Sequence, residues 1–297
     1  MTEAIHKSGF VNIVGNPNVG KSTLMNRLVG ERISIITSKA QTTRHRIMGI
    51  VNTDTMQIVY SDTPGVLHPN YKLQKSMLTF SESALGDADV LLYVTDIVEK
   101  TEKNEVFLRR VQKAGCPVLL LINKIDLSNQ KELEALVGKW RELLPDAGIY
   151  PISAQTGFNV DIVRKRIEEL IPPSPPYFGK DVLTDRPARF FVTEMIREKI
   201  LLYYQKEIPY SVEVVVEQFV EEENNIHIKS VIIVERESQK GIVIGRRGQA
   251  LKKVGMTARK DLEKFFDKKI FLEMYVKVES DWRNRDNMLR MFGYQID

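Results

Sequence analysis

A glycine-rich loop near the start of the chain carries residue types that bind phosphate. The segment reads Gly-Asn-Pro-Asn-Val-Gly-Lys-Ser-Thr, which has the spacing G-x-x-x-x-G-K-S. In such a loop, backbone N–H groups cradle the phosphates, the lysine places a positive charge near the outer two, and the serine hydroxyl is a ligand for Mg²⁺. A glycine-rich turn that only caps a helix is the alternative. We expect a nucleoside triphosphate to contact Gly15, Asn16, Pro17, Asn18, Val19, Gly20, Lys21, Ser22 and Thr23.

A second motif can select the base. Residues 116–126 form an apolar run that ends in Asn123-Lys124-Ile-Asp126. The Asp126 carboxylate can accept hydrogen bonds from the ring N–H and the exocyclic amine of guanine, whereas adenine offers no such pair of donors. Asn123 would tie this loop to the phosphate loop or to the base edge, and the stem of Lys124 would lie along the ring. The alternative is an ordinary turn in which the aspartate caps a helix. The motif favours GTP over ATP.

A third motif follows an apolar run that begins at Met56 and reads Asp62-Thr-Pro-Gly65. Asp62 can hold Mg²⁺, usually through a water molecule, and the Gly65 amide can contact the terminal phosphate. That contact disappears on hydrolysis, so the following segment can relax. In isolation the same four residues would make an unremarkable turn.

The elements that must position these motifs follow from the apolar pattern. Residues 10–14 are apolar enough for a buried strand, and Leu24 and Leu28 suit the helix after the loop. Apolar strands and amphipathic helices alternate from residue 9 to residue 171. This pattern predicts an α/β fold with a mostly parallel sheet, helices on both faces and ligands at the carboxyl ends of the strands.

The order and spacing of the motifs resemble the translation-factor-related GTPases. Ser153-Ala154-Gln155 matches the last guanine-contacting loop of that family, and Lys39–Arg46 occupies its first switch. The resemblance implies that one switch threonine completes the Mg²⁺ shell when GTP is bound. We favour Thr43, with Thr42 as the alternative. The implied metal ligands are Ser22, Thr43 and Asp62, and the implied catalytic residues are Lys21, Thr43, Asp62 and Gly65.

One departure from the best-known small GTPases affects the mechanism. Val66 stands where those proteins carry a glutamine that orients the attacking water, and its side chain cannot form a hydrogen bond. We therefore expect slow intrinsic GTP hydrolysis that depends on backbone groups, a switch residue, a partner or an added cation. Asn18 occupies the position at which related GTPases bind K⁺, which suggests stimulation by K⁺. The alternative is that Asn18 is simply a turn residue.

Composition predicts a globular cytoplasmic protein of two domains. The chain has 297 residues, of which 43% are hydrophobic and 28% charged, and a single cysteine, Cys116, which we interpret as a small core residue. It contains no apolar stretch that could cross a bilayer and no signal peptide. No group of histidines and cysteines has the spacing of metal ligands. His45 is the one histidine within a predicted switch.

A proline-rich segment marks the predicted domain boundary, because four prolines between residues 172 and 176 favour a stiff, extended linker. We assign residues 1–171 to a GTPase domain, 172–181 to the linker and 182–297 to a smaller α+β domain. In the latter we expect a helix near residues 189–204, strands near 212–221 and 226–235, two helices around a glycine-rich turn, and a strand over 270–278.

The glycine-rich turn, Gly245-Arg246-Arg247-Gly248, lies between apolar helical segments and resembles the Gly-x-x-Gly loop of a KH domain, in the type II order of elements. In that family the loop lets a nucleic-acid backbone approach closely, while an apolar groove holds about four unpaired bases. The resemblance implies RNA contacts from Ile242, Ile244, Gly245, Arg246, Arg247, Gly248, Leu251 and Lys252.

Local charge agrees with this interpretation. The net charge of +4 is spread over both domains, but residues 238–260 hold seven Lys and Arg and no Asp or Glu. Such a run beside the loop is the expected footprint of bound phosphates, although charge runs are more often a solvated helix face. We expect single-stranded RNA and no DNA.

Taken together, the GTPase domain, the proline-rich segment and the type II KH domain resemble the Era-type GTPases of bacteria. The resemblance implies a switch protein for 30S ribosomal subunit assembly that binds GTP or GDP, Mg²⁺ and the 3′ end of small-subunit ribosomal RNA. It also implies peripheral contact with the inner membrane. We expect GTP to order the switches and thereby reposition the KH domain or expose its groove. Two alternatives are an RNA-binding placeholder with incidental GTP turnover and a partner GTPase for RNA modification.

Overall fold

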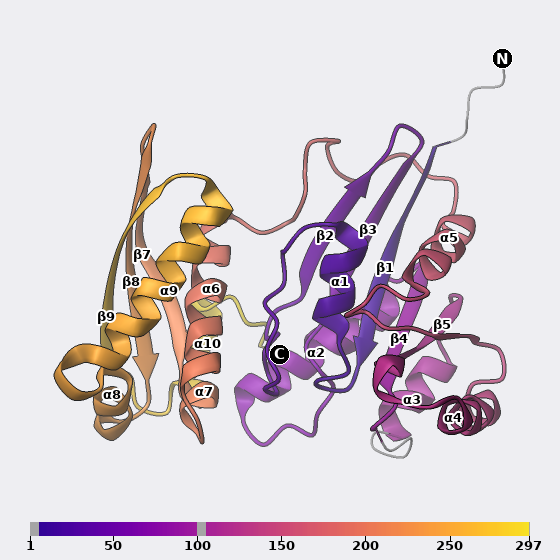
Figure 1. The fold of residues 1–297 in the computed structure, drawn as a ribbon, viewed down its shortest axis with the longest axis horizontal. Helices are drawn as coiled ribbons and strands as arrows, with labels where there is room; N and C mark the ends of the chain where they lie inside the picture. The colour runs from indigo at the N-terminus through magenta and orange to yellow at the C-terminus, as the bar shows by residue number, and fades with distance from the viewer. Residues whose placement is uncertain (1–5, 100–104, 297) are drawn as a thin grey trace. The chain divides into compact units, whose positions relative to one another are not determined.

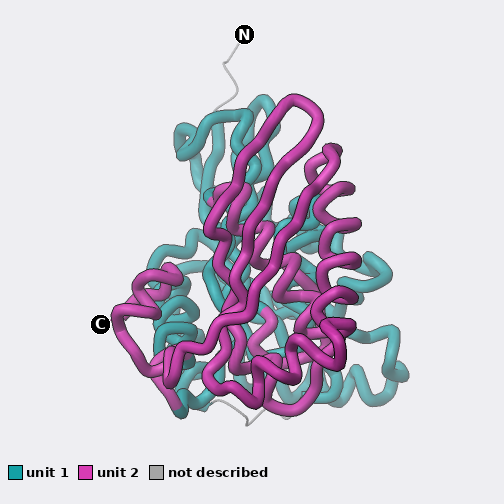
Figure 2. Tube along the Cα trace, turned by 90° about the vertical axis from the view of Figure 1, so that its left-hand side faces the viewer, with its two compact units in different colours: residues 1–34, 43–70, 74–185 teal, residues 35–42, 71–73, 186–297 magenta. Residues whose placement is uncertain are grey.

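The computed structural model describes residues 6–99 and 105–296. Its elements are shown in Figure 1. They form two compact units, which are coloured separately in Figure 2. Unit 1 comprises residues 1–34, 43–70 and 74–185, and unit 2 comprises residues 35–42, 71–73 and 186–297. The two short segments 35–42 and 71–73 therefore belong to unit 2, although they are embedded in the sequence of unit 1.

Unit 1 is built on a six-stranded sheet with the order β2-β3-β1-β4-β5-β6. Only β2 is antiparallel to its neighbour, so the predicted mostly parallel α/β fold is confirmed. The strands are β1 (Lys7–Gly15), β2 (Ile47–Asn52), β3 (Met56–Asp62), β4 (Val90–Asp96), β5 (Val118–Asn123) and β6 (Gly148–Pro151).

Helices cover both faces of this sheet (Figure 1). They are α1 (Lys21–Val29), α2 (Lys72–Gly86), α3 (Glu105–Gln112), α4 (Gln130–Leu143) and α5 (Val160–Leu170), with a short 3₁₀ turn, η1 (Ile125–Leu127). On one face, side chains of α3 and α4 pack with those of the central strands in a cluster that includes Leu91, Val111 and Trp140. All seven residues of β4 are buried, as expected for a parallel strand covered on both sides.

The register of the sheet brings the sequence motifs to one edge. Ile13 of β1 pairs with Asp62 at the end of β3, and Asp96 of β4 pairs with Asn123 at the end of β5. Because parallel strands end on the same side, the phosphate loop after β1 lies between the motifs that follow β3 and β5. Cys116 lies two residues before β5 and is only partly buried, so it is less enclosed than a core cysteine. Burial raises the pKa of its thiol.

The proline-rich segment is bound along unit 1 and is not a free linker. We call residues 172–185 the strap. It contacts the start of β1, where the Ser8 amide donates to the Pro172 carbonyl at 3.1 Å, and then β3, where Gln57 bonds the backbone of Phe178. It ends along β2, where the Ile50 amide donates to the Leu183 carbonyl at 2.8 Å.

Unit 2 contains a three-stranded sheet with the order β7-β8-β9, in which β7 and β8 form an antiparallel hairpin and β9 runs parallel to β8. Its elements follow the order predicted from the sequence, together with a short helix before the first strand and two short helical segments after the last strand, which the sequence did not predict. They are α6 (Ala188–Tyr203), α7 (Ile208–Ser211), β7 (Glu213–Glu221), β8 (Asn225–Val234), α8 (Glu237–Ile244), η2 (Arg246–Gly248), α9 (Gln249–Phe266), β9 (Lys269–Val278), η3 (Trp282–Asn284) and α10 (Asp286–Met291).

The core of unit 2 lies between its helices and one face of this sheet. Val254, Ala258 and Leu262 recur at four-residue spacing on α9 and are fully buried. They pack in one cluster with residues of α6 and the strands, including Ile196 and Ile232. The opposite face of α9, which includes Lys252 and Arg259, is exposed. The hydrophobic period of α9 thus fixes which side of the helix is available to a ligand.

Candidate functional site

The phosphate loop holds its lysine in a buried position. The ammonium group of Lys21 donates to the carbonyls of Gly15 and Asn16 at 3.0 and 2.8 Å, and the residue is 6% exposed. Burial lowers its pKa to about 8, against the opposing attraction of Asp62. A desolvated cation beside a loop of backbone N–H groups is suited to a polyanion, which would restore favourable electrostatics to the lysine.

Three oxygen-bearing side chains meet beside this loop. The Ser22 hydroxyl lies 2.8 Å from that of Thr43 and donates to Oδ2 of Asp62 at 2.7 Å. The Thr43 hydroxyl lies 3.3 Å from the same carboxylate oxygen. Asp62 is fully buried, and this burial raises its pKa against the opposing effects of Lys21 and the hydroxyl hydrogen bonds.

This cluster fits a magnesium ion. Oδ1 of Asp62 is buried and has no hydrogen-bond partner among the residues that the structure describes. Two hydroxyls and a carboxylate are the hard oxygen donors that Mg²⁺ prefers, and a nearby cation would favour the ionised carboxylate. Ser22, Thr43 and Asp62 are therefore the residues that would hold the ion.

The structure distinguishes the two candidate threonines of the first switch. Thr43 belongs to unit 1 and lies in the oxygen cluster. The Thr42 hydroxyl instead donates to the Lys39 carbonyl at 2.6 Å and lies 2.6 Å from the Thr37 hydroxyl, all within unit 2. The geometry thus supports Thr43. His45 is buried, with its ring 6.0 Å from that of Phe80.

The Asp-Thr-Pro-Gly turn is packed tightly against the phosphate loop. A Cβ atom at Gly65 would lie 2.6 Å from Cα of Pro17, so only glycine fits there. Val66 donates its amide to the Gly15 carbonyl at 3.1 Å, and its side chain is buried in the core cluster with Leu91. Val66 therefore anchors the turn, and its side chain is not available to a catalytic water.

The predicted base-recognition residues form one connected group. Nδ2 of Asn123 donates to the Val19 carbonyl at 2.8 Å, and its Oδ1 accepts the Ala154 amide at 2.8 Å. Asn123 therefore joins the phosphate loop to the loop that contains Ser153, Ala154 and Gln155. The Lys124 ammonium donates to the Asn18 carbonyl at 2.6 Å. Asp126 is exposed in η1, so its carboxylate is open to a ligand.

Sequence reasoning missed two residues that hold this group in place. Asp96, at the end of β4, pairs with Lys124 at 2.5 Å. Arg27 of α1 donates to the carbonyls of Ala154 and Gln155 at 2.8 and 2.7 Å. The position of Asp96 at the end of a buried strand was a usable signal. Arg27 had no comparable signal, because an arginine in the last turn of a helix is ordinary.

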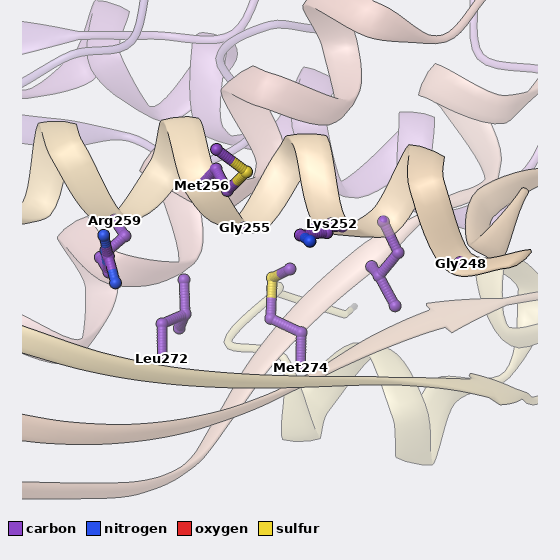
Figure 3. Close-up of a pocket in the computed structure, with 8 residues that line it drawn as sticks. Gly248, Lys252, Gly255, Met256, Arg259, Leu272 and Met274 are labelled. Carbon is purple, nitrogen blue, oxygen red and sulfur yellow. The ribbon is translucent and has the colours of Figure 1, made fainter.

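Unit 2 has a groove between α9 and β9 (Figure 3), which we call the RNA groove because the resemblance to a KH domain predicts RNA there. Its volume is about 400 Å³. Figure 3 shows Leu272 and Met274 rising from β9 toward the helix. The lining residues are Gly248, Leu251, Lys252, Gly255, Met256, Arg259, Leu272 and Met274. An apolar floor with cations on the rim suits bases and a phosphate backbone, respectively.

The structure brings only some of the predicted RNA residues to this groove. Gly248, Leu251 and Lys252 line it, whereas Ile242 and Ile244 lie on α8 and are not among its lining residues. Prediction missed the lining residues Gly255, Met256, Arg259, Leu272 and Met274. The three- and four-residue spacing along α9, from residue 248 to residue 259, was the available signal.

The loop between α8 and α9 depends on its two glycines. Gly245 and Gly248 have φ of 72° and 74°, in the region where side chains are strained. A Cβ at Gly245 would lie 2.5 Å from that of Ala250, whereas the position beside Gly248 is open. Arg246 and Arg247 between them are exposed. A ligand backbone can therefore approach closely at Gly248 with cations beside it.

These two sites define a P-loop GTPase with a KH domain on the same chain. Two family matches agree with this division. Residues 10–124 match the family described as 50S ribosome-binding GTPase, and residues 207–283 match the KH domain family.

Whole-chain relatives give the family. The chain is 46% identical to GTPase Era of Geotalea uraniireducens and 44% identical to GTPase Era of Geotalea daltonii, over 99% of this chain and all of each relative. The chain belongs to the GTPase Era family, as the resemblance predicts.

Solved structures extend the similarity to three dimensions. An Era structure in complex with MgGDPNP and nucleotides 1506–1542 of 16S ribosomal RNA has a TM-score of 0.93 and 38% identity. A single-substitution variant of Aquifex aeolicus Era, bound to GDP.AlF4⁻, has a TM-score of 0.93 and 39% identity. Each comparison covers 98% of this chain and 100% of the other. Within the described residues, no helix is both long and apolar enough to span a membrane.

Proposed function

We propose that this chain is a GTP-dependent switch that binds single-stranded 16S ribosomal RNA near its 3′ end and acts in assembly of the 30S subunit. GTP and Mg²⁺ bind at the phosphate site of unit 1, and RNA binds in the groove of unit 2. The observation that carries the proposal is the fit of both sites within one chain. That chain matches, over 98% of its length, an Era structure in complex with MgGDPNP and nucleotides of 16S ribosomal RNA.

Each residue of the phosphate site has a specific task in this proposal. Lys21 offsets the negative charge on the outer phosphates, and Asp126 accepts two hydrogen bonds from guanine. Ser22, Thr43 and Asp62 would hold the magnesium ion, which would supply positive charge to offset the negative charge of the phosphates during phosphoryl transfer. Asn123 keeps the base loop in register with the phosphate loop through its two hydrogen bonds.

GTP turnover should be slow without a partner, because the side chain of Val66 cannot orient the attacking water. The burial of Val66 supports this expectation. Stimulation by K⁺ through Asn18 remains a hypothesis. Asn18 is exposed with φ of 67°, which is also compatible with a turn residue. Equal turnover in K⁺ and Na⁺ would exclude the K⁺ hypothesis.

The second candidate function is an RNA-binding placeholder whose GTP turnover is incidental. The buried Val66 side chain fits this candidate, because slow turnover is sufficient for a placeholder. A switch also needs a partner that regulates its turnover. The two candidates differ in one property: in a switch, RNA and nucleotide must each change the affinity or turnover of the other.

The deciding experiment measures GTP hydrolysis by the purified protein in K⁺ buffer, with and without an RNA that copies nucleotides 1506–1542 of 16S ribosomal RNA. For a switch, we expect RNA to stimulate turnover in the wild type and not in a Gly248→Asp variant. RNA that binds without changing turnover would favour the placeholder. RNA that does not bind would contradict the proposed partner.

Membrane contact is a separate part of the proposal. We propose that the protein acts in the cytoplasm with peripheral contact to the inner membrane, and the support is the family resemblance alone. Flotation of the purified protein with vesicles of anionic lipid tests the contact, and protein left at the bottom of the gradient would contradict it.

A further inference from the structure

A buried arginine of α6 holds the segment that leads into the magnesium site. Arg197 is 1% exposed and pairs with Glu194 at 2.6 Å. Its guanidinium also donates to the carbonyl of Gln41 at 3.3 Å and to the carbonyl of Thr42. Residues 35–42 and α6 both belong to unit 2, so this contact lies within one compact unit.

These carbonyls lie immediately before Thr43, so the contact with Arg197 affects the predicted magnesium site. The Thr42 carbonyl belongs to the planar peptide unit that continues into Thr43, so fixing that carbonyl restricts where Thr43 can lie. The Thr43 hydroxyl is the one that meets Ser22 and Asp62. Arginine suits this task because its rigid fork of donors can hold two carbonyls at once while pairing with a carboxylate.

The other end of α6 reaches the glycine-rich loop. The Lys39 ammonium donates to the carbonyl of Tyr204, the residue that caps α6. The Tyr204 hydroxyl donates to the Val243 carbonyl at 2.6 Å, two residues before Gly245. Burial raises the pKa of Tyr204 to about 12, so the phenol, which is already a donor at neutral pH, also stays protonated in basic solution.

A second set of contacts runs from the same segment to α9. The Ile36 amide donates to Oε1 of Glu198 at 3.3 Å, and Glu198 pairs with Lys199 at 3.0 Å. Lys199 also pairs with Asp261 of α9, two residues after the groove residue Arg259. The helix that lines the RNA groove and the segment that leads to Thr43 therefore share α6 as a common support.

We propose that Arg197 and Tyr204 are positioning residues that couple the Gly-x-x-Gly loop to the first switch through α6. RNA bound at the loop fixes the end of α8, Tyr204 transmits that order to α6, and Arg197 transmits it to the peptide before Thr43. This inference rests on the proposed function, because it requires both GTP and RNA to bind.

The physical requirement is a differential affinity. If GTP with Mg²⁺ favours the arrangement in which Arg197 holds residues 41 and 42, and RNA favours the same arrangement, then each ligand raises the affinity of the other by the same factor. We call this ratio of affinities the coupling factor. It can be measured from either side, so the two measurements check each other.

Tyr204→Phe tests the link to the loop with the smallest possible change. It removes one hydroxyl and leaves the ring in the core. Tyr203→Phe is the matched control, because Tyr203 is the adjacent residue, is partly exposed, and carries Lys253 over its ring at 4.3 Å. For each protein, the affinity for the 1506–1542 RNA is measured without nucleotide and with GDPNP, and the affinity for GDPNP is measured with and without the RNA.

We expect the coupling factor of Tyr204→Phe to fall by about fivefold, the effect of one buried hydrogen bond, while Tyr203→Phe keeps the wild-type value. A wild-type coupling factor in Tyr204→Phe would overturn the relay and leave the proposed function intact. A coupling factor of one in the wild type would contradict the relay and the switch together, although both ligands bind.

Arg197→Lys tests the other end without leaving Glu194 unpaired. Lysine keeps the charge but lacks the fork, so we expect amides of residues 36–43 to exchange hydrogen faster in the GDPNP complex and the coupling factor to fall. Unchanged exchange in this segment, measured by mass spectrometry against wild type, would show that Arg197 does not hold it. Exchange in β8 serves as the control for overall unfolding.

Discussion

The phosphate site of unit 1 and the RNA groove of unit 2 arrange their polar groups in opposite ways. In the phosphate site, Lys21, Thr43 and Asp62 are each less than 10% exposed, and Asp62 and Thr43 are hydrogen-bonded to the same serine. In the RNA groove, Met256 is 52% exposed and the cations Lys252 and Arg259 lie on the surface. A site that performs phosphoryl transfer needs fixed donors and charges, whereas a site that binds a flexible strand needs accessible surface.

This difference has an energetic consequence. Changing one buried, mutually bonded group should have a large effect on ligand affinity, because the remaining groups lose their partner in a low-dielectric site. Changing one surface cation should have a small effect that depends on salt. The following predictions test the contrast, from the largest expected effect to the smallest.

Lys21→Ala should weaken GTP binding by about 1000-fold, the size expected when one partner of a buried charge pair is removed. The melting temperature without nucleotide should stay within about 4 °C of wild type, because removing a desolvated cation offsets the two lost hydrogen bonds to carbonyls. Titration with a fluorescent GTP analogue and thermal unfolding by circular dichroism measure both. A large loss of stability would show that Lys21 is mainly structural. Lys131→Ala, at an exposed position of α4, is the control.

Asp126→Asn should reduce GTP affinity by about 100-fold or more, because the guanine amine then faces a donor where it had an acceptor. The same change should improve binding of xanthosine triphosphate, whose carbonyl replaces that amine. Competition between the two nucleotides for the variant measures the exchange of preference. Asp161→Asn, an exposed aspartate of α5, should keep the preference for GTP. An unchanged preference in Asp126→Asn would place base recognition elsewhere.

Gly248→Asp should weaken RNA binding by about tenfold with little effect on GTP affinity, because a carboxylate would face the phosphate backbone. Gly248→Asn has nearly the same shape and tolerates the positive φ about as well, so it isolates the effect of charge. Filter binding with the 1506–1542 RNA compares the three proteins. If the Asn and Asp variants lose affinity equally, the cause is the backbone conformation and not the charge.

Arg259→Gln should weaken RNA binding by only a few-fold at moderate salt, and should reduce the slope of log Kd against log salt by about 0.7, the value for one phosphate contact on a single strand. Lys253→Gln removes a charge from the same helix, but Lys253 stacks on Tyr203 and does not line the groove. Its slope should match that of wild type. Equal slopes for both variants would mean that the groove does not guide the RNA backbone.

The phosphate site and the RNA groove also differ in how well the sequence predicts them. The predicted phosphate and guanine residues lie in short loops, and in each loop the residues that contact the ligand are close together in sequence. Lys21, Asp62 and Asp126 could therefore be located from the spacing of the motifs. The RNA groove draws Leu272 and Met274 from a strand that follows α9, and only the folded register of β9 brings them to the helix. The contacts of Arg27 and Arg197 join residues more than 120 and 150 positions apart, respectively, and no local pattern reveals them.

The sequence predicts a stiff, extended linker but does not reveal that this segment is hydrogen-bonded along unit 1. Proline content correctly indicated an extended segment, but Gln57 lies on β3, far from the strap in sequence, and its bonds to Phe178 fix the strap to unit 1. The prolines were interpreted as a spacer because no local feature shows that an extended segment has hydrogen-bond partners elsewhere.

The hydrogen bonds of the strap also leave very few residues free to rotate between the strap and α6. The last bonded strap residue, Asp185, accepts the Met48 amide at 3.0 Å, and α6 begins at Ala188. Only Arg186 and Pro187 lie between these points. The ring of Pro187 fixes its φ, and a residue before proline is itself restricted, so very few torsions can turn at this joint. Few rotatable torsions therefore separate the strap from α6, so flexible residues inserted after Asp185 would add more conformational freedom to the chain than the same residues inserted within the hydrogen-bonded strap.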